Sequence, residues 1–125
     1  MDPCGERPSL LSPSRLAYLG DTVWELYVRE YLVRRNVRRP SEAALSYVTA
    51  KAQCRAAGMI RPLLTEEEED IFRRGRNVSH SNIPRSATLA EYRIATAVEC
   101  LFGWLYLCGR NERLRVLFDA AFSLE

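Results

Sequence analysis

Residues 95–107 read Ala-Thr-Ala-Val-Glu-Cys-Leu-Phe-Gly-Trp-Leu-Tyr-Leu and form the most apolar stretch of the chain. Drawn as a helix, this stretch has apolar side chains on every side, which is typical of a helix buried at the centre of a domain. Thr88-Leu-Ala-Glu91 has the spacing of a capping box, and Gly109 follows the last apolar residue. We therefore predict a central helix that opens at this capping box and ends at Leu107.

The rest of the chain also has helical spacing, and no segment alternates with a period of two. Cap residues and apolar periodicity predict further helices from Ser12-Pro13 to Arg34-Asn36, from about Ser41 to Ala57, from Thr65 to about Arg76, and over a short final stretch with Leu114, Leu117, Phe118 and Phe122. The predicted fold class is all-α.

Length and composition indicate one globular domain. The chain has 125 residues, of which 47% are hydrophobic and 27% are charged. We expect a flexible N-terminal lead over residues 1–13 and one folded domain, large enough to be a catalytic domain, over residues 14–125. The longest apolar stretch, Ala95 to Cys108, is too short to cross a membrane and is interrupted by Glu99.

The N-terminus and the cysteines predict a location. Residues 1–13 contain three prolines and no apolar core, unlike a secretory signal or an amphipathic transit peptide. The four cysteines are scattered, which favours free thiols in a reducing compartment. We expect a cytoplasmic bacterial protein and no membrane partner, with the plastid stroma as the less favoured location.

Two carboxylates lie in unfavourable places. Glu99 is in the middle of the most apolar helix, where a buried carboxylate needs an arginine, a set of donors or a metal ion. Asp21 follows Gly20 in the middle of the first helix, and both residue types are poor helix formers. Close approach of another backbone at Gly20 and a required carboxylate at Asp21 would explain this pair. A tight helix crossing with a solvated Asp21 is the alternative.

Other acidic and histidine residues have simpler explanations. Glu25 has a surface partner in Arg29, and the acidic run Glu66–Asp70 follows a capping Thr65 at a helix N-terminus. His80 is the only histidine, which excludes a histidine-rich zinc site and disfavours a Ser-His-Asp triad. Acid-base or metal chemistry would therefore depend on carboxylates.

The positive charge has the form that suits phosphate. Of 18 basic residues only Lys51 is a lysine, and arginine binds phosphate with two parallel hydrogen bonds. Residues 73–85 contain Arg73, Arg74, Arg76, Asn77 and Arg85 but no acid. Such a segment could contact a nucleic-acid backbone without reading bases. A solvated helix end whose arginines complement the dipole is the alternative.

Two stretches together resemble a known family. Leu16-Ala-Tyr-Leu-Gly-Asp-Thr-Val23 resembles the signature helix of ribonuclease III, and residues 95–107 resemble its second hallmark helix. Residues 48–53, residues 65–77 and Tyr92-Arg93 are similar to the compact Mini-ribonuclease III branch, which lacks a double-stranded-RNA-binding domain. The matches extend over nearly the whole chain after Pro13.

The resemblance implies a ribonuclease III-like helical endonuclease domain that forms a homodimer and cleaves double-stranded RNA with Mg²⁺, for which Mn²⁺ could substitute. It implies that Asp21 and Glu99 are both catalytic residues and metal ligands, and that Tyr18 lies at the dimer interface. The expected substrate is the 23S ribosomal RNA precursor, shaped by a large-subunit ribosomal protein. The residues expected to bind RNA are Arg73, Arg74, Arg76, Asn77, Arg85 and Lys51.

The chain departs from the family pattern at three positions. Ser14 and Ala17 stand where the signature helix usually has glutamates, and Thr96 stands where the second helix usually has aspartate. Fewer carboxylates suggest weaker metal affinity and leave open whether one or two metals bind. A non-catalytic RNA-binding or ribosome-assembly protein on the same fold is the main alternative, and a dimerisation domain without an RNA role is the second.

Overall fold

The computed structural model describes residues 7–79 and 87–122, and all regular structure in these ranges is helical. A 3₁₀ turn, η1 (Pro8–Leu10), precedes α1 (Pro13–Arg34), and a second turn, η2 (Arg61–Leu63), precedes α4. The remaining helices are α2 (Pro40–Val48), α3 (Ala50–Ile60), α4 (Glu66–Arg76), α5 (Leu89–Leu107) and α6 (Asn111–Ala121). The prediction of an all-α fold is confirmed.

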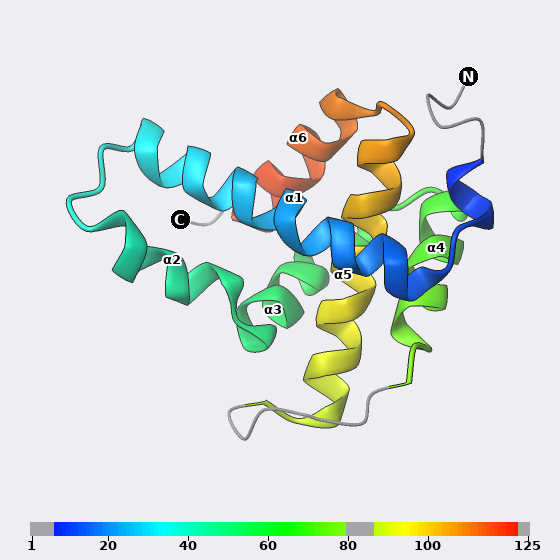
Figure 1. The fold of residues 1–125 in the computed structure, drawn as a ribbon. Helices are drawn as coiled ribbons and strands as arrows, with labels where there is room; N and C mark the ends of the chain where they lie inside the picture. The colour runs from blue at the N-terminus through cyan, green and yellow to red at the C-terminus, as the bar shows by residue number, and fades with distance from the viewer. Residues whose placement is uncertain (1–6, 80–86, 123–125) are drawn as a thin grey trace.

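Helix α5 is the centre of the molecule, as its apolar sequence predicts. Ten of its residues are buried, and α1 crosses it while α3, α4 and α6 pack around it (Figure 1). The core continues into an aromatic cluster in which the ring centroid of Trp24 lies 5.0 Å from Phe102 and 5.4 Å from Phe118. None of the helices is both long and apolar enough to span a membrane in the described part of the chain.

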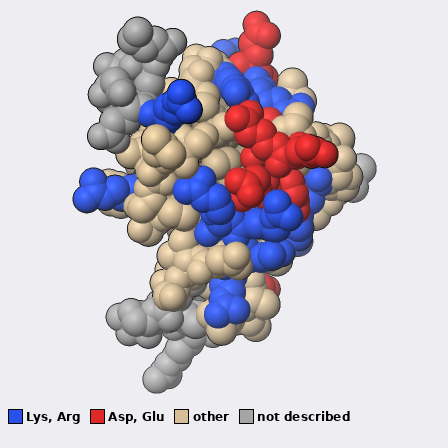
Figure 2. Space-filling view, turned by 90° about the vertical axis from the view of Figure 1, so that its right-hand side faces the viewer, with Lys and Arg blue, Asp and Glu red and all other residues tan. Residues whose placement is uncertain are grey.

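The helix ends follow from local sequence. Thr65 and Thr88 each form a complete capping box, with Glu68 and Glu91 respectively. The interpretation of the acidic run as a helix start is therefore confirmed. Figure 2 shows acidic side chains gathered beside arginines on the face that includes α4, and Glu67 and Glu69 pair with Arg110 and Arg61.

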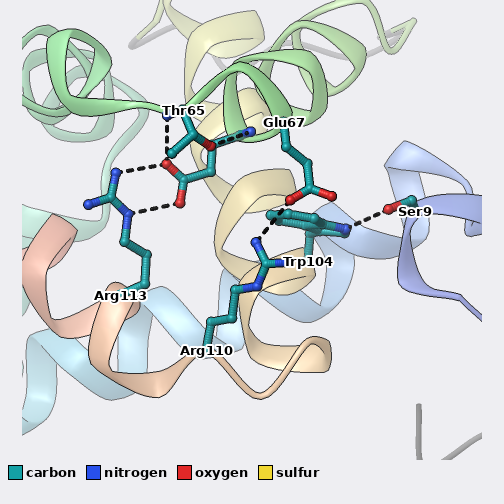
Figure 3. Close-up of polar contacts among 7 residues, drawn as sticks. Ser9, Thr65, Glu67, Trp104, Arg110 and Arg113 are labelled. Carbon is teal, nitrogen blue, oxygen red and sulfur yellow. Dashed lines mark hydrogen bonds and ion pairs between the residues drawn. The ribbon is translucent and has the colours of Figure 1, made fainter. Parts of the chain in front are cut away.

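Ion pairs also fasten α6 to α4. The Arg113 guanidinium donates to both carboxylate oxygens of Glu68 at 2.8 Å, next to the capping Thr65 (Figure 3). Burial acts to raise the pKa of Glu68, but the bonds from Arg113 and Thr65 outweigh it and hold the pKa below its ordinary value. The Arg110 guanidinium lies 4.7 Å from the ring centroid of Trp104 and also pairs with Glu67.

The prediction of one helix from Ser41 to Ala57 is wrong. The chain breaks at Thr49, which is extended with φ −72° and ψ 158° and whose hydroxyl accepts a hydrogen bond from the Ala52 amide. Helix α3 then continues through Gly58 to Ile60. Threonine favours a cap over a helix interior, but single threonines are tolerated inside helices, so apolar spacing alone did not reveal this break.

Residues 8–11, within the expected flexible lead, contact the helical domain. The Trp104 indole donates to the Ser9 hydroxyl at 3.0 Å (Figure 3), and Arg74 donates to the backbone oxygens of Ser9 and Leu11. Residues 1–6 lie outside the described part. Among the described residues, Cys54, Cys100 and Cys108 form no disulfide.

Candidate active site

A backbone contact between two helices creates the site. A Cβ atom on Gly20 of α1 would lie 1.6 Å from the Glu99 carbonyl oxygen, and one on Gly103 of α5 would lie 2.0 Å from the Leu16 carbonyl oxygen. No side chain larger than hydrogen can occupy either position without moving the helices apart. The close approach expected at Gly20 is therefore present. It places Asp21, the next residue in α1, beside Glu99 of α5.

Both carboxylates line one open pocket of about 620 Å³. Its walls come from α1, the α2–α3 break, the end of α4 and the first half of α5, and its lining residues include Ser14, Ala17, Tyr18, Asp21, Thr49, Gln53, Ser79, Tyr92, Thr96 and Glu99. The structure thus brings together two carboxylates that are 78 residues apart in the sequence. The three positions that depart from the family pattern also lie here and carry no charge.

The surroundings of Glu99 strongly shift its pKa. Burial of Glu99 is the main cause that raises its pKa to about 8, and hydrogen bonding and charge repulsion from Asp21 add to the effect. An amide hydrogen bond from Gln53 acts in the opposite direction. Within the described residues, neither carboxylate forms an ion pair with an arginine or lysine. The site therefore holds two adjacent carboxyl groups that no described arginine or lysine pairs with.

This donor set fits a small, hard cation. Two adjacent carboxylates without a basic partner favour a divalent ion, which would offset their repulsion, and Mg²⁺ usually keeps several waters rather than a full protein cage. Groups of three or more acidic, cysteine or histidine ligands are absent from the described residues. Asp21 and Glu99 are therefore the residues here that could hold the ion.

The residues expected to bind RNA lie at different distances from this pocket. Val78 and Ser79 line it directly after α4 ends at Arg76, and Asn77 is the exposed C-cap of that helix. Arg73 is exposed and its guanidinium lies 3.6 Å from Asp70. Lys51 is exposed in the first turn of α3, next to Ala50 of the pocket lining. Arg85 and His80 lie outside the described residues.

Arg74 has a role that the sequence analysis missed. It is half-buried, and its guanidinium donates to the backbone oxygens of Ser9 at 2.9 Å and Leu11 at 3.3 Å. These bonds hold the N-terminal segment against α4. Its expected contact with RNA has no support from this position.

Tyr18 and Gln53 are the other notable residues. Tyr18 is 86% exposed at the edge of the pocket, an unusual exposure for an aromatic side chain on a central helix. Gln53 is only 3% exposed and contacts Glu99, yet the sequence analysis assigned it no role. A polar residue among the alanines of a buried helix face is the signal that could have identified it.

The chain is similar to known proteins over most of its length. The model of the ribonuclease III domain matches residues 14–110. The Mini-ribonuclease 3 of Symbiobacterium thermophilum is 45% identical over 117 residues, covering 91% of this chain and 90% of that protein. The Mini-ribonuclease 3 of Gloeobacter violaceus is 44% identical over 119 residues, covering 94% of this chain and 85% of that protein.

A solved structure shows the same fold. The crystal structure of a protein from Fusobacterium nucleatum has a TM-score of 0.81 and 32% sequence identity, and the match covers 91% of this chain and 93% of that one. The family motifs, the fold and the relatives all extend over most of the chain. The chain therefore belongs to the ribonuclease III domain family, within its Mini-ribonuclease 3 branch.

Proposed function

We propose that the protein is a Mg²⁺-dependent endoribonuclease that cleaves double-stranded RNA. The observation that carries this proposal is the meeting of Asp21 and Glu99 in one open pocket, next to helices whose backbones touch at Gly20 and Gly103. A non-catalytic protein on the same fold would have no need for a half-buried carboxylate beside a second one, because that arrangement costs stability.

In this proposal Asp21 and Glu99 hold the cation. A bound Mg²⁺ would supply a polarised water and offset the negative charge that develops on a scissile phosphate. The rigid crossing of α1 and α5 fixes the two carboxylates relative to each other. Asp21 and Glu99 would both be catalytic residues, because they would bind this ion directly.

The basic side chains near the pocket would bind the duplex backbone. Arg73, Arg76 and Asn77 lie at the end of α4, which leads into the pocket wall, and Lys51 follows Ala50 of the pocket lining. Arg85 is included from its sequence position alone. Arginine and amide groups bind phosphate oxygens without regard to base sequence, which suits an enzyme that recognises duplex shape.

The finer assignments follow the family resemblance. We propose a homodimer with Tyr18 at its interface, the 23S ribosomal RNA precursor as the substrate, and a large-subunit ribosomal protein as a partner that shapes it. A cytoplasmic location agrees with this substrate. Each of these assignments can be tested apart from the cleavage activity.

The experiment that tests the activity is cleavage of a labelled RNA duplex by the purified protein. We expect internal cuts in both strands with Mg²⁺ or Mn²⁺, none in excess chelator, and little cutting of the separated strands. Binding of the duplex without any cut, under the same conditions, would instead favour the non-catalytic alternative.

A further inference from the structure

Gln53 is a buried polar residue at the edge of the pocket. It lies on α3, where its neighbours Ala52, Ala56 and Ala57 are buried and apolar. Only 3% of the residue is exposed, so its amide needs polar partners within the protein. A hydrophobic side chain of similar volume would fill this place at less cost, which makes the amide itself the feature to explain.

The partner of this amide is one of the two site carboxylates. Gln53 Nε2 of α3 donates to Glu99 Oε2 of α5 at 3.4 Å, and these two helices pack against each other. A glutamate side chain has three rotatable bonds, and a fixed donor on one oxygen limits the positions that its carboxylate can take. An amide does so without neutralising the carboxylate, whereas an arginine or lysine would compete with a cation for the same charge.

The local backbone holds Gln53 in this position. The break at Thr49 ends α2, and the Thr49 hydroxyl caps the new helix by accepting from the Ala52 amide at 3.2 Å. Thr49, Ala50 and Gln53 then all line the pocket. One continuous helix would point this face elsewhere, so the break and the glutamine belong to the same arrangement.

We propose that Gln53 is a positioning residue that holds the Glu99 carboxylate in place to bind the divalent cation. This inference rests on the proposed function, in which Asp21 and Glu99 are the metal ligands. Residues that hydrogen-bond to metal ligands typically contribute a factor of about 10 to 100 in metal affinity or activity. We expect an effect of that size from Gln53.

The direct test is a calorimetric titration of the purified protein with Mn²⁺ alone. Gln53→Met removes the amide but nearly keeps the side-chain volume, and we expect Mn²⁺ affinity to fall by about 10- to 100-fold. Cys54→Ala is the matched control, because it trims the next residue of α3, which is half-buried and does not line the pocket. That control should bind Mn²⁺ like the parent protein.

A second readout separates positioning from a purely structural role. At limiting Mg²⁺ the Gln53→Met enzyme should have a reduced kcat on duplex RNA, and added Mg²⁺ should restore much of it. Duplex affinity in chelator and the KM should stay within about two-fold, since Gln53 is buried and its amide donates to Glu99. A merely structural residue would lower the melting temperature without moving the Mn²⁺ titration.

Gln53→Asn provides a second variant that keeps a buried amide but shortens it by one methylene group. It should also bind Mn²⁺ more weakly, and it decides the question if Gln53→Met does not fold. A folded variant that titrates Mn²⁺ like the parent overturns the inference. If Asp21→Asn is inactive while Gln53→Met is parent-like, only the role of Gln53 fails. If Asp21→Asn itself binds Mn²⁺ and cuts normally, the proposed function fails.

Discussion

Asp21 and Glu99 lie side by side because the backbones of α1 and α5 touch at Gly20 and Gly103. Each breaks a rule of helix composition at its own position, so a sequence reader can select both. Nothing in their spacing indicates that they meet, because that depends on the angle at which α1 crosses α5. The family resemblance placed them together, and the contact at Gly20 supplies the physical reason.

Substitutions that remove the charge of Asp21 or Glu99 test whether these two carboxylates hold the ion. Asp21→Asn and Glu99→Gln keep shape and hydrogen-bonding capacity, so both variants should fold and bind duplex RNA. Cleavage should fall by several orders of magnitude, because the ion that activates water and offsets phosphate charge is lost. Single-turnover cleavage with saturating enzyme measures this, and circular dichroism checks folding. A variant that cuts at nearly the parent rate would show that its carboxylate is structural.

The raised pKa of Glu99 predicts an unusual dependence of stability on pH. Its pKa is about 8 in the folded chain against 4.5 as the ordinary value, so the folded state binds this proton more tightly. Between these values stability falls as pH rises, by at most about 1.4 kcal/mol per pH unit from this group. In chelator, Glu99→Gln should therefore raise the melting temperature at pH 8.5, with a gap that nearly closes at pH 5.

Saturating Mn²⁺ provides the control for this comparison. The ion stabilises the folded parent protein by binding it, so the advantage of Glu99→Gln at pH 8.5 should shrink or reverse. A gap that stays constant from pH 5 to pH 8.5 in chelator would mean that Glu99 titrates normally in the folded protein.

At the level of helices, sequence patterns predicted most elements but missed the break between α2 and α3. Cap residues located the starts of α1, α4 and α5, because a capping box is a local device that sequence displays directly. The break between α2 and α3 at Thr49 depends on how α3 packs against α5, and apolar spacing runs across it without interruption. This missed break is the one that brings Gln53 to Glu99.

The α1–α5 crossing should tolerate no Cβ atom. Gly20→Ala would place a methyl group 1.6 Å from the Glu99 carbonyl oxygen, so the helices must separate. We expect a loss of at least about 3 kcal/mol in unfolding free energy and a loss of metal binding.

Gly58→Ala in α3 is the control, because a Cβ there meets nothing within 4 Å. It should raise stability by about 0.5 to 1 kcal/mol. Urea denaturation compares the two, and equal stabilities would contradict the backbone contact.

The basic residues at the end of α4 should give electrostatic, sequence-independent affinity. Replacing Arg73 and Arg76 by alanine should weaken binding to all duplexes and reduce the slope of log affinity against log salt by about one unit per lost phosphate contact. Arg74→Ala should instead lower the melting temperature, because it releases the backbone oxygens of Ser9 and Leu11. Fluorescence anisotropy at several salt concentrations measures the slope. An unchanged slope in the double variant would place these arginines away from the RNA.

At the level of the whole molecule, exposed apolar side chains on α1 and α5 favour a second copy of the chain. Tyr18 is 86% exposed, and Leu26 and Tyr106 are 60% and 49% exposed. Aromatic residues are typical of interface centres, where they contribute most of the binding energy. We propose that a second copy of the chain covers this surface.

Tyr18 therefore gives the test of assembly. If its ring fills a cavity in a partner subunit, Tyr18→Ala should cost several kcal/mol of dimer stability while leaving the isolated fold intact, because the side chain has almost no contacts within its own chain. Light scattering at micromolar concentration should show a dimeric parent and a monomeric variant. Leu10→Ala is the control, since Leu10 is 77% exposed in η1 and does not line the pocket. It should stay dimeric. A monomeric parent protein at this concentration would contradict the assembly, and a dimeric Tyr18→Ala protein would move the interface to another face.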